Sequence, residues 1–118
     1  MLIAVAHGSR NAEWRASVER VVQSLAPELG ADAVRLAYME CTPPTLRDIV
    51  AEAAGKGIAR VRVLPLFLAD EGHVDRDIRP LVDDLRVAFK DLEVELMPAI
   101  GQHPLFRTLL HHIAAEQP

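Results

Sequence analysis

Residues 64–73 read Leu-Pro-Leu-Phe-Leu-Ala-Asp-Glu-Gly-His, and this stretch decides the fold class. Val61 and Val63 lead into an apolar run typical of a buried strand, which breaks off at two acids and a glycine. From Val74 to Phe89 the apolar residues recur at helical spacing. A strand that turns through a Gly-His corner into a helix places the histidine at the carboxyl edge of a sheet, where open α/β proteins bind ligands.

The start of the chain repeats this arrangement. Residues 2–6 (Leu-Ile-Ala-Val-Ala) form a short apolar run, too short for a helix, and predict a fully buried strand. His7-Gly8-Ser9-Arg10 follows, and then a second helical pattern. We therefore expect two strands that each deliver a histidine to the same edge of the sheet.

The segment after the first strand predicts one amphipathic helix. Ser9 or Asn11 can cap its start, and Gly30 ends it. Its apolar stripe comprises Trp14, Val18, Val21, Val22, Leu25 and Leu29.

Three further strands and three further helices are expected. The strands cover 33–39, where Arg35 indicates a less covered edge position, 60–68 and 93–97. Thr42 with Pro43 and Pro44 predicts the start of the second helix, because proline suits a first helical turn. The inward residues expected on the three helices are Leu46, Ile49, Val50, Ala53 and Ala54 for the second; Leu81, Val82, Leu85 and Phe89 for the third, from about 78 to 90; and Leu105, Leu109, Leu110 and Ile113 for the last.

Four β-α units with short connections predict one α/β domain over residues 1–118. Alternating strands and helices imply a parallel sheet with right-handed crossovers and helices on both faces. We expect a flavodoxin-like three-layer α/β/α sandwich with a four-stranded sheet in the order 2-1-3-4, which sets strands one and three side by side.

Composition excludes several function classes. The formal charge of −4 argues against non-specific nucleic-acid binding, which needs a basic field. The single cysteine, Cys41, excludes an internal disulfide and suits a reducing cytosol, with a small buried side chain as its simplest role. The sequence has neither a signal-peptide pattern nor an apolar stretch of membrane-spanning length, so we expect a cytoplasmic protein that binds no membrane.

Three side chains on the expected edge can bind a metal ion or accept protons. His7, Glu40 and His73 follow strands one, two and three, and two imidazoles with a carboxylate suit a borderline divalent cation. Imidazole also accepts protons near neutral pH. The structural alternatives are a solvated or capping histidine at either position and, for Glu40, a partner for the dipole of the next helix.

Other charged residues near this edge carry weaker signals. His103 stands at a helix entry, where capping is the simpler role and ligand contact the alternative, while His111 and His112 read as solvated. The turn after His7 leaves N–H groups suited to an anion. Arg10, Arg15, Arg76 and Arg79 can meet carboxylates at the mouth or serve as ordinary surface charges balanced by Asp75 and Asp77.

At these residues the chain resembles the small class II chelatases of the CbiX/SirB type, which insert a metal into sirohydrochlorin. The matching pieces are Ala6-His7-Gly8-Ser9-Arg10, Glu40 ahead of Pro43-Pro44-Thr45, Pro65-Leu66-Phe67-Leu68, Gly72-His73-Val74 and Asp77-Ile78. They occur in family order over nearly the whole chain. The departures are Glu71, where a small residue is common, and Arg79, which intervenes before Pro80.

The resemblance implies a chelatase domain that is one half of a two-lobed architecture. It implies that His7 and His73 bind the metal and accept protons, that Glu40 is the third metal contact, and that a homodimer builds the cleft between two copies. Ser9, Arg10 and Arg79 would meet the carboxylates of sirohydrochlorin. The metal would be Co²⁺ in the first place, with Fe²⁺ or Ni²⁺ as alternatives, and no other cofactor is implied. No Walker-type phosphate loop is present, which agrees with an ATP-independent reaction in cobalamin or sirohaem biosynthesis.

Three other readings share the fold pattern. A histidine phosphatase needs an arginine where Ala6 stands, and a response-regulator receiver needs acids where His7 and His73 stand. A non-catalytic metal- or tetrapyrrole-binding module would keep both histidines. This reading remains open. A measurement of turnover distinguishes such a module from an enzyme.

Overall fold

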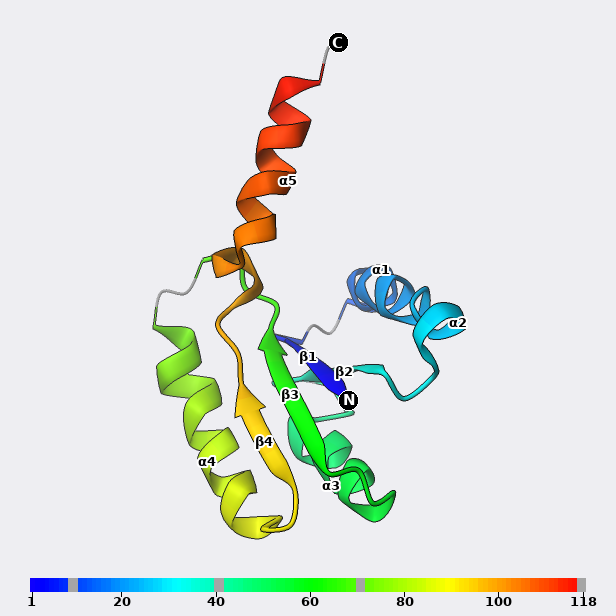
Figure 1. The fold of residues 1–118 in the computed structure, drawn as a ribbon, viewed down its shortest axis with the longest axis vertical. Coiled ribbons are helices and arrows are strands. Elements are labelled where there is room, and N and C mark those ends of the chain that lie inside the picture. The colour runs from blue at the N-terminus through cyan, green and yellow to red at the C-terminus, as the bar shows by residue number, and fades with distance from the viewer. Residues whose placement is uncertain (9–10, 40–41, 70–71, 117–118) are drawn as a thin grey trace.

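The computed structural model describes residues 1–8, 11–39, 42–69 and 72–116, and its elements alternate as expected (Figure 1). In chain order they are β1 (Leu2–Ala6), α1 (Ala12–Gln23), α2 (Ala26–Leu29), β2 (Val34–Tyr38), α3 (Leu46–Gly55), β3 (Arg60–Pro65), a π-helical turn (Val74–Ile78), α4 (Arg79–Ala88), β4 (Glu93–Leu96), a 3-10 turn (Ile100–Gln102) and α5 (Pro104–Ala115).

The four strands form one parallel sheet in the order β2-β1-β3-β4. Leu2 of β1 pairs with Val34 of β2 on one side and with Arg62 of β3 on the other. The predicted order is confirmed, and β2 lies at an edge, as Arg35 indicated. Because β1 and β3 are neighbours, the corners that follow them meet at the same end of the sheet.

Burial alternates along β3, because successive side chains point to opposite faces. Val61 and Val63 are fully buried on the face covered by α3 and α4. The main core lies there, and its other large members are Ile3, Val5, Leu46, Ile49, Val50, Phe67, Val74, Ile78, Val82, Leu85, Leu92 and Val94. The opposite face holds a smaller cluster of Ala4, Ala6, Leu36 and Tyr38, against which Val18 and Val22 of α1 pack.

The prediction of one continuous helix over residues 11–29 is wrong. Asn11 caps the start as expected, its Oδ1 accepting from the N–H groups of Glu13 and Trp14. The helix ends at Gln23, and α2 is a separate turn that contains Pro27. Proline cannot donate the N–H that a continuous helix would need there, and its ring clashes with the preceding turn.

The expected apolar stripe of this segment is also only partly buried. Trp14 is 44% exposed and Val21 66%. The reason is that α1 covers only the small β1–β2 cluster, so Val18 and Val22 are the members of the stripe that pack against it.

The second helix starts later than predicted. Pro43 and Pro44 precede it, and Pro44 O accepts from the N–H of Tyr38. Helix α3 begins at Leu46, where Thr45 and Asp48 form a reciprocal capping box. A side-chain cap that satisfies two free N–H groups fixes this start better than proline, which removes one donor.

The third helix has a π-helical first turn, which the periodicity did not reveal. The N–H of Arg79 donates to Val74 O, five residues back, and α4 continues from there with Pro80 in its first turn. Leu81 is 41% exposed rather than inward. Strand β3 ends at Pro65 instead of residue 68.

Helix α5 projects from the body of the molecule (Figure 1). The longest dimension is 51 Å against 33 and 29 Å for the others, and the radius of gyration is 15.2 Å. A compact domain of this length has a radius of about 13.5 Å. Among the described residues, no helix combines the length and apolar character needed to cross a membrane.

Candidate metal-binding site

The rings of His7 and His73 lie next to each other, edge to face, beyond the carboxyl ends of β1 and β3. Their centroids are 5.5 Å apart with an angle of 84° between the ring planes. Phe67 packs against both imidazoles, at 4.7 Å from His7 and 6.1 Å from His73. The pairing of β1 with β3 therefore brings together the two histidines that the sequence predicted would share an edge.

The two corners depend on glycine. Gly8 has φ +96° and Gly72 has φ +90°, a backbone conformation that residues with a Cβ rarely adopt. The turn at Gly72 is closed by Arg76, whose backbone N–H and Nε both donate to Gly72 O. His73 is thus held immediately before the π-helical turn.

A carboxylate one turn further along fixes the His73 ring. Nδ1 of His73 lies 3.2 Å from Oδ2 of Asp77, and because an ionised carboxylate can only accept, this contact assigns the hydrogen to Nδ1. With its proton on Nδ1, the neutral ring keeps the lone pair of Nε2 for a metal ion or a proton. Carboxylates bound to the far nitrogen orient metal-binding histidines in this way.

The histidines line an open hollow of about 480 Å³. Its other walls are Met39, Arg76, Asp77 and Leu81. A second hollow of about 250 Å³, mostly apolar, shares Met39 and Leu81 with the first. A ligand bound at the histidines can therefore make apolar contacts with Met39 and Leu81.

The predicted carboxylate-binding residues do not all lie at this hollow. Arg79 pairs with Asp75, its Nε 2.8 Å from Oδ1, and does not line the hollow. Arg76 does line it. Ser9, Arg10 and Glu40 lie outside the described residues, as does Cys41.

Within the described part of the chain, no group of three His, Cys, Asp or Glu side chains is arranged to hold a metal. The described ligand set is therefore the histidine pair. His103 caps α5, its Nδ1 accepting from the N–H of Leu105, which confirms the simpler of its two readings. His111 and His112 are exposed on α5, as expected.

Sequence reasoning gave no site role to Asp77 or Phe67. The signal for Asp77 was present, since residues four apart lie on one face of a helix and His73 precedes it by four. Gly101 was also missed: a Cβ there would lie 1.7 Å from Leu68 O, so only glycine fits beside the segment that carries Phe67. Nothing in the sequence indicated that contact.

The parallel sheet and the two histidines at its carboxyl edge together define an open α/β protein with a paired-histidine site. The family model for CbiX matches residues 1–117, and the chain belongs to this family.

Individual relatives agree with this assignment. The chain is 31% identical over 77 residues to the sirohydrochlorin cobaltochelatase of Methanosarcina acetivorans, an alignment that covers 65% of this chain and 59% of that protein. The structure superimposes with a TM-score of 0.82 on a cobalamin (vitamin B12) biosynthesis CbiX protein from Marinobacter aquaeolei VT8, at 28% identity over 96% of this chain and 92% of the other.

A longer protein shares the fold. The sirohydrochlorin chelatase SirB from Bacillus subtilis subspecies spizizenii, in complex with cobalt, matches with a TM-score of 0.78 at 18% identity. The match covers 96% of this chain but 49% of SirB. At this identity the likeness concerns the fold alone.

Proposed function

We propose that the protein is a sirohydrochlorin chelatase, a lyase that inserts a divalent metal ion into sirohydrochlorin without ATP. Co²⁺ is the first candidate, because the Methanosarcina relative is named a cobaltochelatase. Fe²⁺ and Ni²⁺ are the alternatives, since imidazole binds each of them. The product would serve cobalamin or sirohaem biosynthesis in the cytoplasm.

The observation that carries the proposal is that the rings of His7 and His73 lie 5.5 Å apart at the carboxyl edge of the sheet. Metal insertion removes two protons from the ring nitrogens of the substrate and strips water from the ion. An imidazole pair can hold the ion above the ring and, once the metal has moved, each imidazole can take up one of the two protons and pass it to water. Asp77 would keep the His73 tautomer that leaves Nε2 available.

The substrate would lie across the hollow at the histidines. Met39 and Leu81 offer apolar contacts to the flat ring, and Arg76 offers a cation for its carboxylates. Ser9, Arg10 and Arg79 remain candidates for further carboxylates. Glu40 remains the candidate for the third metal contact.

We further propose that the chain works as one lobe of a homodimer. The SirB chain is about twice as long, which is the relation expected if two copies of this domain replace two fused lobes. An active monomer in sedimentation at assay concentrations would contradict this.

The alternative is a non-catalytic module that binds metal or tetrapyrrole stoichiometrically. Mixing catalytic amounts of protein with sirohydrochlorin and Co²⁺ under anaerobic conditions separates the two. A chelatase accelerates the absorption change of the ring over the spontaneous rate for many turnovers. A binding module gives a change that stops at one equivalent of protein.

A further inference from the structure

A second hollow continues inward from the one at the histidines. It has a volume of about 250 Å³ and lies between the start of α3 and the first half of α4, and we call it the α3–α4 pocket. Met39 and Leu81 line both hollows, so a ligand bound at the histidines can reach into the pocket. Its floor is formed by Val5, Ile78 and Leu85, which are buried members of the main core. A group that enters the pocket is therefore largely removed from water.

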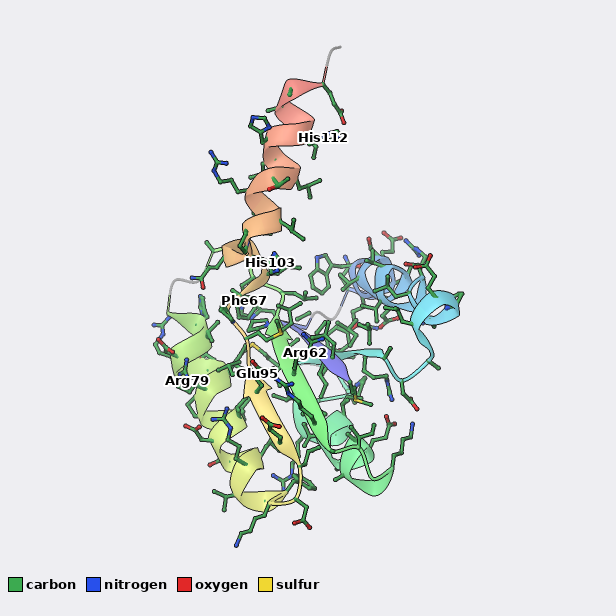
Figure 2. All side chains as sticks on the ribbon, in the orientation of Figure 1. Arg62, Phe67, Arg79, Glu95, His103 and His112 are labelled. Carbon is green, nitrogen blue, oxygen red and sulfur yellow. The ribbon has the colours of Figure 1, made fainter. Side chains whose placement is uncertain are left out.

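The α3–α4 pocket exists because the two helices cover different strands. Among the strands, α3 contacts mainly β1 and β2, whereas α4 contacts mainly β4. Helix α4 begins with Arg79 at the carboxyl edge of the sheet, where Phe67 lies beyond β3, and runs back along the sheet (Figure 1; Figure 2). Leu81 in its first turn therefore borders the gap, which explains why this predicted inward residue is 41% exposed.

The size of the pocket suits one substituent of a ring and not the ring itself. Pockets that enclose a whole small molecule measure about 300–1,000 Å³. The α3–α4 pocket is smaller and has the volume of about eight water molecules at about 30 Å³ each. A side chain a few carbon atoms long fits this space, with its methylene groups against Val5 and Leu85.

A cation on the α3 wall indicates the charge of that substituent. The guanidinium of Arg47 lies over the ring of Phe89, with Cζ 5.9 Å from the ring centroid. An arginine held over an aromatic ring keeps its in-plane N–H groups available for a carboxylate. No carboxylate within the described ranges pairs with Arg47, whereas Arg79 is already paired with Asp75.

Two further polar side chains line the pocket. Thr45 Oγ1 accepts from the N–H of Asp48, and its own hydrogen can be donated to an anion. Asp84 is exposed on the α4 wall. A ligand carboxylate would therefore bind on the side of Arg47 and Thr45, where it is attracted, and away from Asp84, which repels it.

We infer that the α3–α4 pocket receives one carboxylate side chain of the tetrapyrrole substrate, and that Arg47 binds its carboxylate. The inference rests on the chelatase activity proposed above and adds a specificity-determining residue to it. The apolar floor contacts the methylene groups, and the ring is anchored at one side while its centre stays over His7 and His73. A substituent that ends in a neutral amide would leave Arg47 unpaired, so the pocket selects a free acid at this position.

Titration of the whole chain with metal-free sirohydrochlorin tests this subsite. Arg47→Gln should raise the Kd about 10-fold, the lower end for a hydrogen bond to a charged group, because Arg47 is exposed. In the chelatase assay KM should rise by the same factor with kcat nearly unchanged, because the contact is the same in the ground state and the transition state. Arg47→Lys should recover part of the affinity, since lysine keeps the charge but not the planar fork. Arg20→Gln, at an exposed arginine near the end of α1, is the matched control and should bind like the parent.

Asp84→Asn should have the opposite sign. Removing the repelling charge should tighten the binding of sirohydrochlorin by about two- to threefold, a typical size for an exposed charge. An Asp84 variant that binds as weakly as Arg47→Gln would contradict a carboxylate in the pocket.

The titration contains no metal, so it separates the subsite from the activity. If Arg47→Gln binds sirohydrochlorin as tightly as Arg20→Gln and turns over with the KM of the parent, the subsite is wrong and the chelatase activity stands. If Arg47→Gln weakens binding but the parent shows no turnover with Co²⁺, Fe²⁺ or Ni²⁺, the chelatase activity is wrong and the subsite stands.

Discussion

The imidazole rings of His7 and His73 lie 5.5 Å apart, although they follow strands in different β-α units. This separation suits two imidazoles that share one ion, because metal–nitrogen bonds are about 2.0–2.1 Å long. Phe67 packs against both rings and limits the directions in which they can turn. The separation of the His7 and His73 rings is the geometric basis of the proposed metal insertion.

Replacing His73 with alanine should reduce metal insertion to the spontaneous rate, because one imidazole alone cannot hold the ion over the ring and accept its proton. The thermal midpoint and circular dichroism should stay close to those of the parent, since the side chain is partly exposed. His111→Ala, on the exposed surface of α5, is the matched control. Near-normal turnover of the His73 variant would remove this residue from the mechanism.

Asp77→Asn should weaken metal binding and slow insertion by about 10- to 100-fold, the usual effect of losing a carboxylate that orients a metal-binding histidine. The comparison is Asp75→Asn, which breaks the pair with Arg79 at a similar helix position and should have little effect. Titration with Co²⁺ measures the affinity directly. Equal affinities for the two variants would mean that the bond between His73 and Asp77 has no role in binding.

Gly101→Ala should displace the segment that carries Phe67, because the new Cβ would lie 1.7 Å from Leu68 O. We expect a loss of stability of about 1–3 kcal/mol, typical of overpacking, together with slower metal insertion. Gly55→Ala is the control, since a Cβ there meets nothing within 4 Å. A Gly101 variant with unchanged melting and turnover would contradict the close approach of the two segments.

Tyr38 should titrate well above an ordinary tyrosine. Burial, helped by the hydrogen bond it donates to Glu19 and by the charge of that carboxylate, raises the pKa of Tyr38 to about 12. In the unfolded chain the value returns to about 10. Between these two pH values the folded state retains a proton that the unfolded state has lost, so stability falls as the pH rises from about 10 to 12.

The loss of folding stability between these pH values is at most about 2.7 kcal/mol, because each pKa unit corresponds to 1.36 kcal/mol. Tyr38→Phe should remove this loss. Tyr38 is the single tyrosine of the chain, so tyrosinate absorbance reports its pKa without ambiguity. A folded-state midpoint near 10 would contradict the burial and the bond to Glu19.

Periodicity predicted the alternating strands and helices, and turn residues placed both histidines at the ends of strands. The strand order 2-1-3-4 was predicted as the commonest topology for a chain of this length, because the pattern itself cannot fix it. The short apolar run before His7-Gly8 located the end of β1, whereas the run before Gly72-His73 extends beyond Pro65, where β3 ends. The alternation of elements indicated the parallel sheet. Those signals are local, and each residue involved lies within a few positions of the feature it determines.

Tertiary relationships could not be predicted in this way. The π-helical turn that carries Asp77 left no mark on the periodicity of the apolar residues. The contact between Gly101 and Leu68 joins segments far apart in the sequence. The apolar stripe of α5 was visible from spacing, but its lack of cover depends on the direction in which the chain leaves β4. Each of its large aliphatic side chains is more than half exposed instead of inward: Leu105, Leu109, Leu110 and Ile113.

X-ray absorption at the cobalt edge tests most directly whether His7 and His73 hold one metal ion together. The sample is protein loaded with one equivalent of Co²⁺, and the comparison is with the His7→Ala and His73→Ala variants. We expect two imidazole ligands on the ion in the parent and one in each variant. A spectrum of the parent with fewer than two imidazoles, or one that neither substitution changes, would contradict the claim that His7 and His73 hold the metal together.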